Sequence, residues 1–159
     1  MNPNPPLLNS EPASTGGPAE SSMRLSYLIG SADRMVKRRL TEVLEPCGLT
    51  LPQFTALSVL NARGPLSNAQ LAERSLITPQ SANEVVKAME AGGWISREPD
   101  PAHGRIVQLQ LTPSGRQLMR RCDEAVTRVE RQMLHGVEGQ HAALLHLLLQ
   151  TCVRNLRTT

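Results

Sequence analysis

The chain has 159 residues, a formal net charge of +3 and a pI near 9.1. Its 40% hydrophobic content suffices for one folded domain of ordinary size. No apolar run approaches the roughly 18 residues of a membrane span, and the N-terminus lacks the features of a secretory signal. Three cysteines without CxxC spacing argue against a disulfide framework or a zinc ribbon. These features favour a cytoplasmic protein without a membrane partner.

The basic charge lies in the part of the chain that we expect to fold. Residues 1–21 contain five prolines, two acidic side chains and no basic one, which predicts a flexible tail. Residues 22–159 hold 17 basic and 12 acidic side chains. This balance permits a polyanionic partner without identifying one. An aromatic content of 2% disfavours a platform that stacks single-stranded bases.

Apolar spacing and capping signals predict four helices in the first part of the chain. Two segments, Thr50-Leu-Pro-Gln53 and Ser67-Asn-Ala-Gln70, have the form of capping boxes. Thr78-Pro79 places a hydroxyl at a helix N-cap and proline at the first helical position. The predicted helices cover residues 22–45, Thr50 to Gly64, Ser67 to about Ser75, and Thr78 through Ala91.

The apolar period changes after Gly93. Residues 94–97 and 105–111 predict two strands, and the turn-rich segment 99–104 between them predicts a hairpin with an extended tip. Two further helices are predicted from Thr112 to about His135 and over residues 140–157. The last helix is apolar around most of its circumference, so we expect it to be buried on more than one side.

This order of elements predicts a mainly α fold with a small β-hairpin wing. A winged helix-turn-helix lobe over residues 49–111, called the reading lobe below, is held between helical arms at residues 22–48 and 112–159. The domain thus covers residues 22–159. Its arms carry more apolar surface than one small lobe can cover, which predicts a homodimer built from both ends of the chain.

The predicted helix after Thr78 has a polar face suited to reading DNA. Its apolar residues cluster on one side, and Gln80, Glu84 and Lys87 lie opposite, flanked by Ser81 and Asn83. Amide and ammonium groups can hydrogen-bond to base edges, and hydroxyls at a helix N-terminus favour a phosphate. A merely solvated helix face would have the same composition. The surrounding architecture favours binding to double-stranded DNA.

Charge counts limit the expected strength of binding. Residues 51–111 hold five basic and five acidic side chains, so no broad basic patch is predicted. Binding would depend on a few cations, chiefly Arg97 and Arg105 in the wing, with arginines from the arms nearby. We therefore expect a moderate dependence of affinity on salt, as for a few phosphate contacts per protomer.

Several motifs at this spacing resemble the multiple antibiotic resistance regulator (MarR) family. They are Leu49-Thr-x-x-Gln53-Phe, Leu71-Ala, Thr78-Pro-Gln-Ser81, Glu90-x-x-Gly93-Trp-Ile and Val107-x-Leu-x-Leu-Thr112-x-x-Gly115. The resemblance covers Ser22 to the C-terminus. It implies a homodimeric repressor with its fourth helix in adjacent major grooves of a palindromic operator, its wing arginines in the minor groove, and release by a small phenolic or aromatic carboxylate ligand.

By position, the resemblance assigns DNA contacts to the fourth helix and the wing. In that family an Asp usually stands two residues before the wing arginine, and here His103 occupies that place, with Asp100 as a possible substitute. The DNA-contacting residues predicted from pattern and resemblance together are Thr78, Gln80, Ser81, Asn83, Lys87, Arg97, His103 and Arg105.

An anionic aromatic ligand needs an apolar cleft with one or two donors. The seam between the first helix and the reading lobe offers Tyr27, Ser31, Arg34 and Gln53. For Tyr27, a half-buried core position is the competing interpretation. No cofactor is expected.

Other functions stay open at this point. A redox-responsive regulator could use Cys47, although packing explains all three cysteines. The histidines at 135, 141 and 146 lack the spacing of a metal site on one helix. No catalytic motif predicts an enzyme. An adaptor that binds protein through its terminal helices, without DNA, is the remaining alternative.

Overall fold

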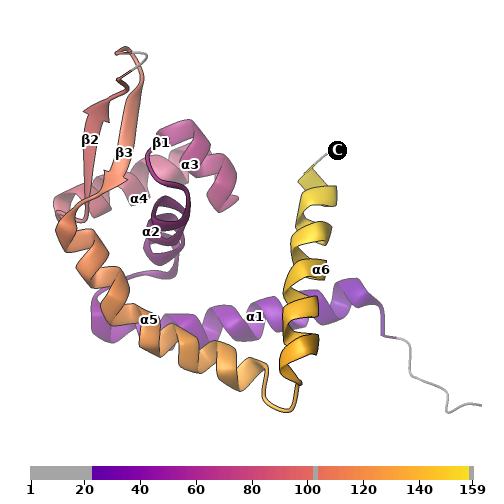
Figure 1. The fold of residues 1–159 in the computed structure, drawn as a ribbon. Helices are drawn as coiled ribbons and strands as arrows, with labels where there is room; N and C mark the ends of the chain where they lie inside the picture. Colours follow the sequence, from indigo (N-terminus) through magenta and orange to yellow (C-terminus); the bar gives the residue numbers. More distant parts are fainter. Residues whose placement is uncertain (1–22, 102–103, 158–159) are drawn as a thin grey trace, which may run out of the picture.

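The computed structural model describes residues 23–101 and 104–157, which form a small lobe carried on long helices (Figure 1). The elements in chain order are α1 (Leu25–Leu44), the short 3-10 helix η1 (Glu45–Cys47), α2 (Leu51–Arg63), β1 (Leu66–Ser67), α3 (Asn68–Ser75), α4 (Pro79–Ala91), β2 (Ile95–Pro99), β3 (Val107–Leu111), α5 (Pro113–Met133) and α6 (Gly139–Arg157).

Side-chain caps start the helices of the lobe where the sequence predicts them. Thr50 Oγ1 accepts from the Gln53 backbone N–H at 3.4 Å, and Gln53 Oε1 accepts from the Thr50 N–H at 2.9 Å. In the second capping box, Ser67 Oγ accepts from the Gln70 backbone N–H at 3.2 Å, and Gln70 Oε1 accepts from the Ser67 N–H at 2.9 Å. Each box satisfies two backbone donors that have no partner within the helix. The capping predictions are therefore confirmed.

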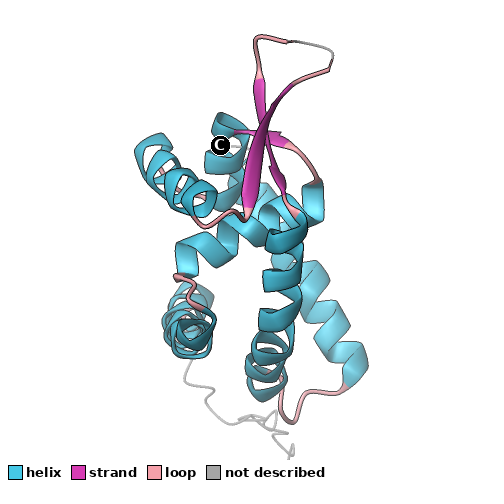
Figure 2. Ribbon diagram, turned by 90° about the vertical axis from the view of Figure 1, so that its left-hand side faces the viewer, coloured by secondary structure: helices cyan, strands magenta, loops and turns pink. Residues whose placement is uncertain are grey.

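The sheet has three antiparallel strands in the order β1-β3-β2, one more than the predicted hairpin. The added strand is β1, in which Leu66 pairs with Leu109 of β3. A two-residue strand is too short to show alternation in the sequence, and it exists because β3 offers it an edge. Beyond this edge β2 and β3 continue as a ribbon away from the helices (Figure 2).

The core lies where α2, α3, α4 and the sheet meet. Leu57, Leu71 and Val86 are fully buried there, and Leu109 reaches them from β3. Val107 lies two residues before Leu109, on the same face of β3, but is 45% exposed because the ribbon has already left the core at that point. No polar or charged side chain is buried among the described residues, so apolar burial holds the lobe together.

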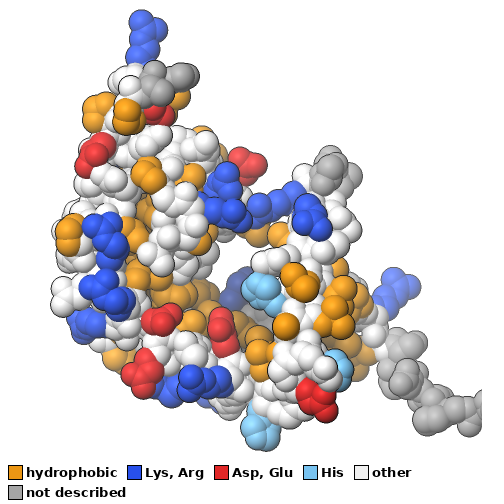
Figure 3. All heavy atoms as spheres, in the orientation of Figure 1, with side chains coloured by type: hydrophobic (Ala, Val, Ile, Leu, Met, Phe, Trp, Pro, Cys, Tyr) orange, Lys and Arg blue, Asp and Glu red, His pale blue; other side chains and the backbone are white. Residues whose placement is uncertain are grey.

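The two ends of the chain form the arms. Helix α1 packs along α5, whereas α6 is separated from the lobe along most of its length in Figure 1. No residue of α6 is buried, and Leu144, Leu147 and Leu148 are each more than half exposed. The expectation that α6 is buried on more than one side is thus not met within one chain. Figure 3 shows the resulting hydrophobic surface on α6.

Within the described part of the chain, no single helix combines the length and the apolar character needed to cross a bilayer. Only α1 with η1, taken together with α2, meets such a test, and this pair is bent by 86°.

Candidate nucleic-acid interface

Helix α4 presents a polar face to solvent at the surface of the lobe. Ala82, Val86 and Met89 are fully buried on its inner side. The side chains on the outer side are exposed, and they are Gln80, Asn83, Glu84 and Lys87. This division agrees with the predicted helix orientation and leaves amide, carboxylate and ammonium groups available to an external partner.

The N-terminus of α4 is held by Thr78. Its Oγ1 accepts from the Ser81 backbone N–H at 3.1 Å and donates to Ser81 Oγ at 2.9 Å. Pro79 lacks a backbone N–H, but an N–H at the first helical position would have no acceptor within the helix, so no hydrogen bond is lost. Both hydroxyls therefore lie together at the positive end of the α4 dipole, where a phosphate oxygen is favoured.

An asparagine of α3 forms a hydrogen bond with the exposed face of α4. Asn68, the first residue of α3, donates from Nδ2 to Asn83 Oδ1 at 2.6 Å. The pair is separated by 15 residues, and no local pattern signals it in the sequence. Among the predicted DNA-contacting residues of α4, Asn83 is therefore the one whose orientation another helix fixes.

Arg97 is tied to α4. Its Nε and Nη2 donate to the two carboxylate oxygens of Glu90 at 2.6 and 2.9 Å. The hydrogen bonds from Arg97 hold the pKa of Glu90 below its usual value, and the carboxylate of Glu90 raises the pKa of Arg97. The prediction of Arg97 as a cation available to DNA overlooked this partner, since Glu90 neutralises much of its charge.

Arg105 differs from Arg97. It is exposed on the wing and makes no hydrogen bond or ion pair with any other residue that the structure describes. Asp100, proposed as its orienting partner, accepts through Oδ2 from Gln108 Nε2 at 2.6 Å. His103 lies outside the described residues. Among its described residues, the wing thus offers one cation, Arg105, whose charge stays available to a partner.

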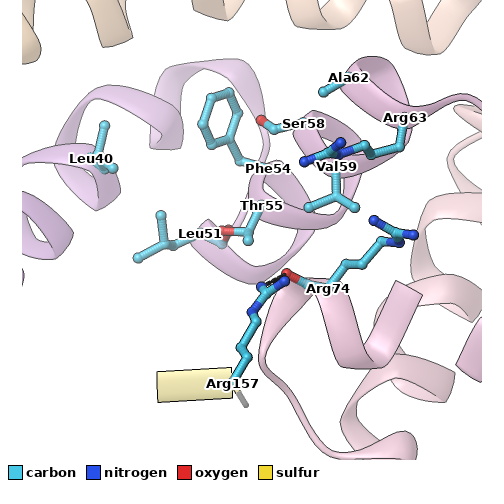
Figure 4. Close-up of a pocket in the computed structure, with 10 residues that line it drawn as sticks. All are labelled: Leu40, Leu51, Phe54, Thr55, Ser58, Val59, Ala62, Arg63, Arg74 and Arg157. Carbon is cyan, nitrogen blue, oxygen red and sulfur yellow. Dashed lines mark hydrogen bonds between the residues drawn. The ribbon is translucent and has the colours of Figure 1, made fainter. Parts of the chain in front are cut away.

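A separate cleft of about 390 Å³ lies between α2, the end of α3 and the end of α6 (Figure 4). Apolar side chains form much of its wall, including Leu51, Phe54 and Val59. Its basic residues come from α2, α3 and α6, and they are Arg63, Arg74 and Arg157.

The three arginines of this cleft have no acidic partner within the described part of the chain. Arg157 Nη2 donates to the Arg74 carbonyl oxygen at 3.5 Å, a long hydrogen bond that joins α6 to the lobe. None of the three forms an ion pair with a described residue. Figure 3 shows the basic side chains that reach from the lobe to the end of α6. An apolar wall with unneutralised guanidinium groups favours a small apolar anion.

The structure brings together only three of the four predicted ligand contacts. Tyr27, Ser31 and Arg34 line a hollow of about 360 Å³ on one side of α1, where Arg34 Nη2 donates to Ser31 Oγ at 3.1 Å. Gln53 does not line this hollow, because its side chain caps α2. Tyr27 is 56% exposed, so it is not a half-buried core residue within one chain.

All three cysteines are free thiols, and Cys47 and Cys122 lie in packed positions. Cys122 is fully buried on α5, and Cys47 packs against the same core. Burial raises the pKa of the Cys122 thiol to about 12, and a hydrogen bond with Cys47 adds to the shift. A thiol with this pKa is a poor nucleophile near neutral pH. For Cys122, the geometry agrees with the packing role predicted from the sequence.

The family model described as MarR family matches residues 48–106. The HTH-type transcriptional repressor Rv2887 of Mycobacterium tuberculosis is 33% identical over 110 residues, which span 69% of this chain and 79% of that protein.

Solved structures show the same fold. Wild-type MarR from E. coli superposes with a TM-score of 0.71 at 22% identity, covering 82% of this chain and 97% of that one. Rv2887 in complex with DNA superposes with a TM-score of 0.67 at 27% identity, covering 82% and 98%. Fold, family model and relatives agree, and the chain belongs to the MarR family of transcriptional regulators.

Proposed function

We propose that this protein is a homodimeric repressor that binds a palindromic operator through α4 and the wing and is released by a small aromatic carboxylate or phenolic ligand. The observation that carries the proposal is the exposed polar face of α4 opposite a fully buried apolar face, with Arg105 unpaired among the described residues on the adjoining wing. The structure of Rv2887 with DNA supports this use of the fold.

The dimer is supported by apolar surface that one chain leaves uncovered. Exposed hydrophobic side chains follow α6 and the N-terminal half of α1, where Leu25 and Leu28 are at least half exposed. A second copy that covers both helices would remove this surface from water. It would also present two α4 helices to successive major grooves, whose centres lie about 34 Å apart on one side of the duplex.

The arginine cleft supports the release step. An aromatic ring fits its apolar wall, and the guanidinium groups of Arg63 and Arg74 are suited to a carboxylate. Rv2887 has been solved with salicylic acid and with p-aminosalicylic acid. Because the cleft joins the lobe to the end of α6, a ligand there would shift the reading lobe relative to the arms.

The proposal is tested by fluorescence anisotropy with labelled DNA from upstream of the gene for this protein. We expect binding that weakens with salt as for a few phosphate contacts per protomer, and dissociation on addition of salicylate. Dimerisation without any DNA binding would favour the adaptor function instead.

Matched variants distinguish the two candidate ligand sites. Arg74→Gln should raise the salicylate concentration needed for release by about tenfold, as expected for a lost charged hydrogen bond of roughly 1.5 kcal/mol. Arg34→Gln removes the corresponding charge from the hollow on α1 and should leave that concentration unchanged. The reverse pattern would place the ligand beside Tyr27.

A further inference from the structure

We propose that Asn68 determines which base α4 reads, by fixing the orientation of the Asn83 carboxamide. The inference rests on the proposed DNA-binding function and adds to it a positioning residue outside the reading helix. Asn68 begins α3, the helix that precedes α4 in the chain. Its role would be to select a base through Asn83, without contacting the DNA itself.

The contact between the two side chains is short and directional. Asn68 Nδ2 donates to Asn83 Oδ1 at 2.6 Å. Asn83 is exposed on the same helical face as Gln80 and Lys87, three positions after one and four before the other. Since its oxygen is held by Asn68, Asn83 presents its NH₂ group, with two donors, to whatever lies against α4.

The surroundings of Asn68 favour this orientation over the reverse one. Its Oδ1 is buried and has no hydrogen-bond partner among the residues that the structure describes. Turning the amide over would bury an NH₂ group at that place and leave two donors unsatisfied in place of one acceptor. Each unsatisfied buried polar group costs about 1–3 kcal/mol, so the orientation with the buried oxygen is the less costly one. The direction of the hydrogen bond to Asn83 is set accordingly.

The orientation has a direct consequence for base recognition. An asparagine that reads adenine in the major groove must accept from N6 and donate to N7 at once. Asn68 engages one lone pair of Asn83 Oδ1 and holds that oxygen toward α3, so Asn83 is better suited to donate from its NH₂ group to the O6 and N7 acceptors of guanine. The sequence pattern alone allowed adenine for this residue, and the contact with Asn68 shifts the expected preference to guanine.

The test selects bound sequences from random double-stranded DNA with the full-length protein. Asn83→Ala identifies the base position that Asn83 reads, as the position whose preference disappears. At that position we expect the wild type to favour guanine over adenine by roughly tenfold, within the range for one side chain on one base pair. Replacing this guanine by 7-deazaguanine, which lacks the N7 acceptor, should remove most of the preference.

Variants of Asn68 then separate positioning from simple support of the fold. Asn68→Asp supplies only acceptors, so Asn83 should donate to it and turn Oδ1 toward the DNA. The preference at that position should move to adenine or cytosine, both of which offer an amino donor. Asn68→Ala should leave guanine and adenine bound about equally, because the freed amide can present either edge. Asn61→Asp on α2 adds the same charge and should change no base preference.

Retention of the guanine preference in both Asn68 variants, with unchanged thermal stability, would overturn the assignment. A wild-type preference for adenine at the position identified by Asn83→Ala would also overturn it. If the wild-type protein selects a DNA sequence and the Asn83→Ala variant keeps every base preference, this inference alone is refuted. If the wild-type protein selects no DNA sequence, that result contradicts the proposed function as well.

Discussion

Glu90 on α4 and Arg97 on β2 form a bidentate ion pair, with donor to acceptor distances of 2.6 and 2.9 Å. The two residues are seven positions apart and belong to the two elements proposed to touch DNA. The pair therefore links the orientation of the wing to that of the reading helix. We therefore expect Arg97 to contribute to DNA binding by holding the wing in place, and Arg105 to be the wing cation that contacts DNA.

Replacing Glu90 by Gln should loosen the wing without unfolding the lobe. The pair is partly exposed, so we expect a loss of up to about 1 kcal/mol, or up to fivefold in DNA affinity. Backbone amides of β2 and β3 should exchange hydrogen faster, and those of α2 should not. Glu98→Gln serves as the matched control, because Glu98 is the neighbour of Arg97 on β2. Equal effects of both substitutions would contradict the positioning role.

The same pair gives a defined dependence of stability on pH. Its hydrogen bonds lower the pKa of Glu90 from the usual value near 4.5. The stabilisation is therefore fully present above about pH 4.5 and is lost as the pH falls through the lowered pKa. Denaturant unfolding of the wild type and Glu90→Gln should differ at neutral pH and converge in acid. A difference that grows on acidification would contradict this assignment.

Gly115 is required by a close approach between α5 and the segment before β2. A Cβ atom at this position would overlap the carbonyl oxygen of Trp94, which accepts from the Thr112 backbone N–H at 3.0 Å. Gly115→Ala should destabilise the protein by about 1–3 kcal/mol, because backbone must move to make room. Gly139→Ala, where the added atom meets nothing within 4 Å, is the control. Urea unfolding measures both, and a neutral Gly115→Ala would refute the argument.

Leu76 ends α3 in the left-handed region, with φ of 55°, and its side chain is 72% exposed. This conformation costs a leucine about 1–2 kcal/mol, and little packing is lost when the side chain is removed. Glycine loses more backbone entropy on folding than leucine, which offsets part of this gain. The net effect of Leu76→Gly should be a stabilisation of about 0.5–1 kcal/mol. Ala69→Gly, inside the same helix, should destabilise it by about 1 kcal/mol. Thermal unfolding distinguishes the two signs.

Features set by neighbouring residues could be predicted from the sequence. The capping boxes at Thr50 and Ser67 use side chains three positions from their partners, so residue identity was sufficient. The buried face of α4 followed in the same way from helical spacing.

Features that join distant segments could not be predicted. Leu66 becomes a strand only beside β3, and the Asn68–Asn83 hydrogen bond crosses from one helix to the next. The arginine cleft combines α2 with the ends of α3 and α6, including Arg157 near the C-terminus. The local sequence around each residue does not predict these contacts, because they form only when the helices and strands pack together.

Hydroxyl-radical footprinting on the DNA upstream of the gene tests the central claim most directly. A symmetric dimer that reads two major grooves should protect two segments related by a two-fold axis, with centres about one helical turn, or 10–10.5 base pairs, apart. Salicylate should remove both protected segments together. Protection of a single unpaired segment, or none at concentrations where the protein is dimeric, would contradict the account.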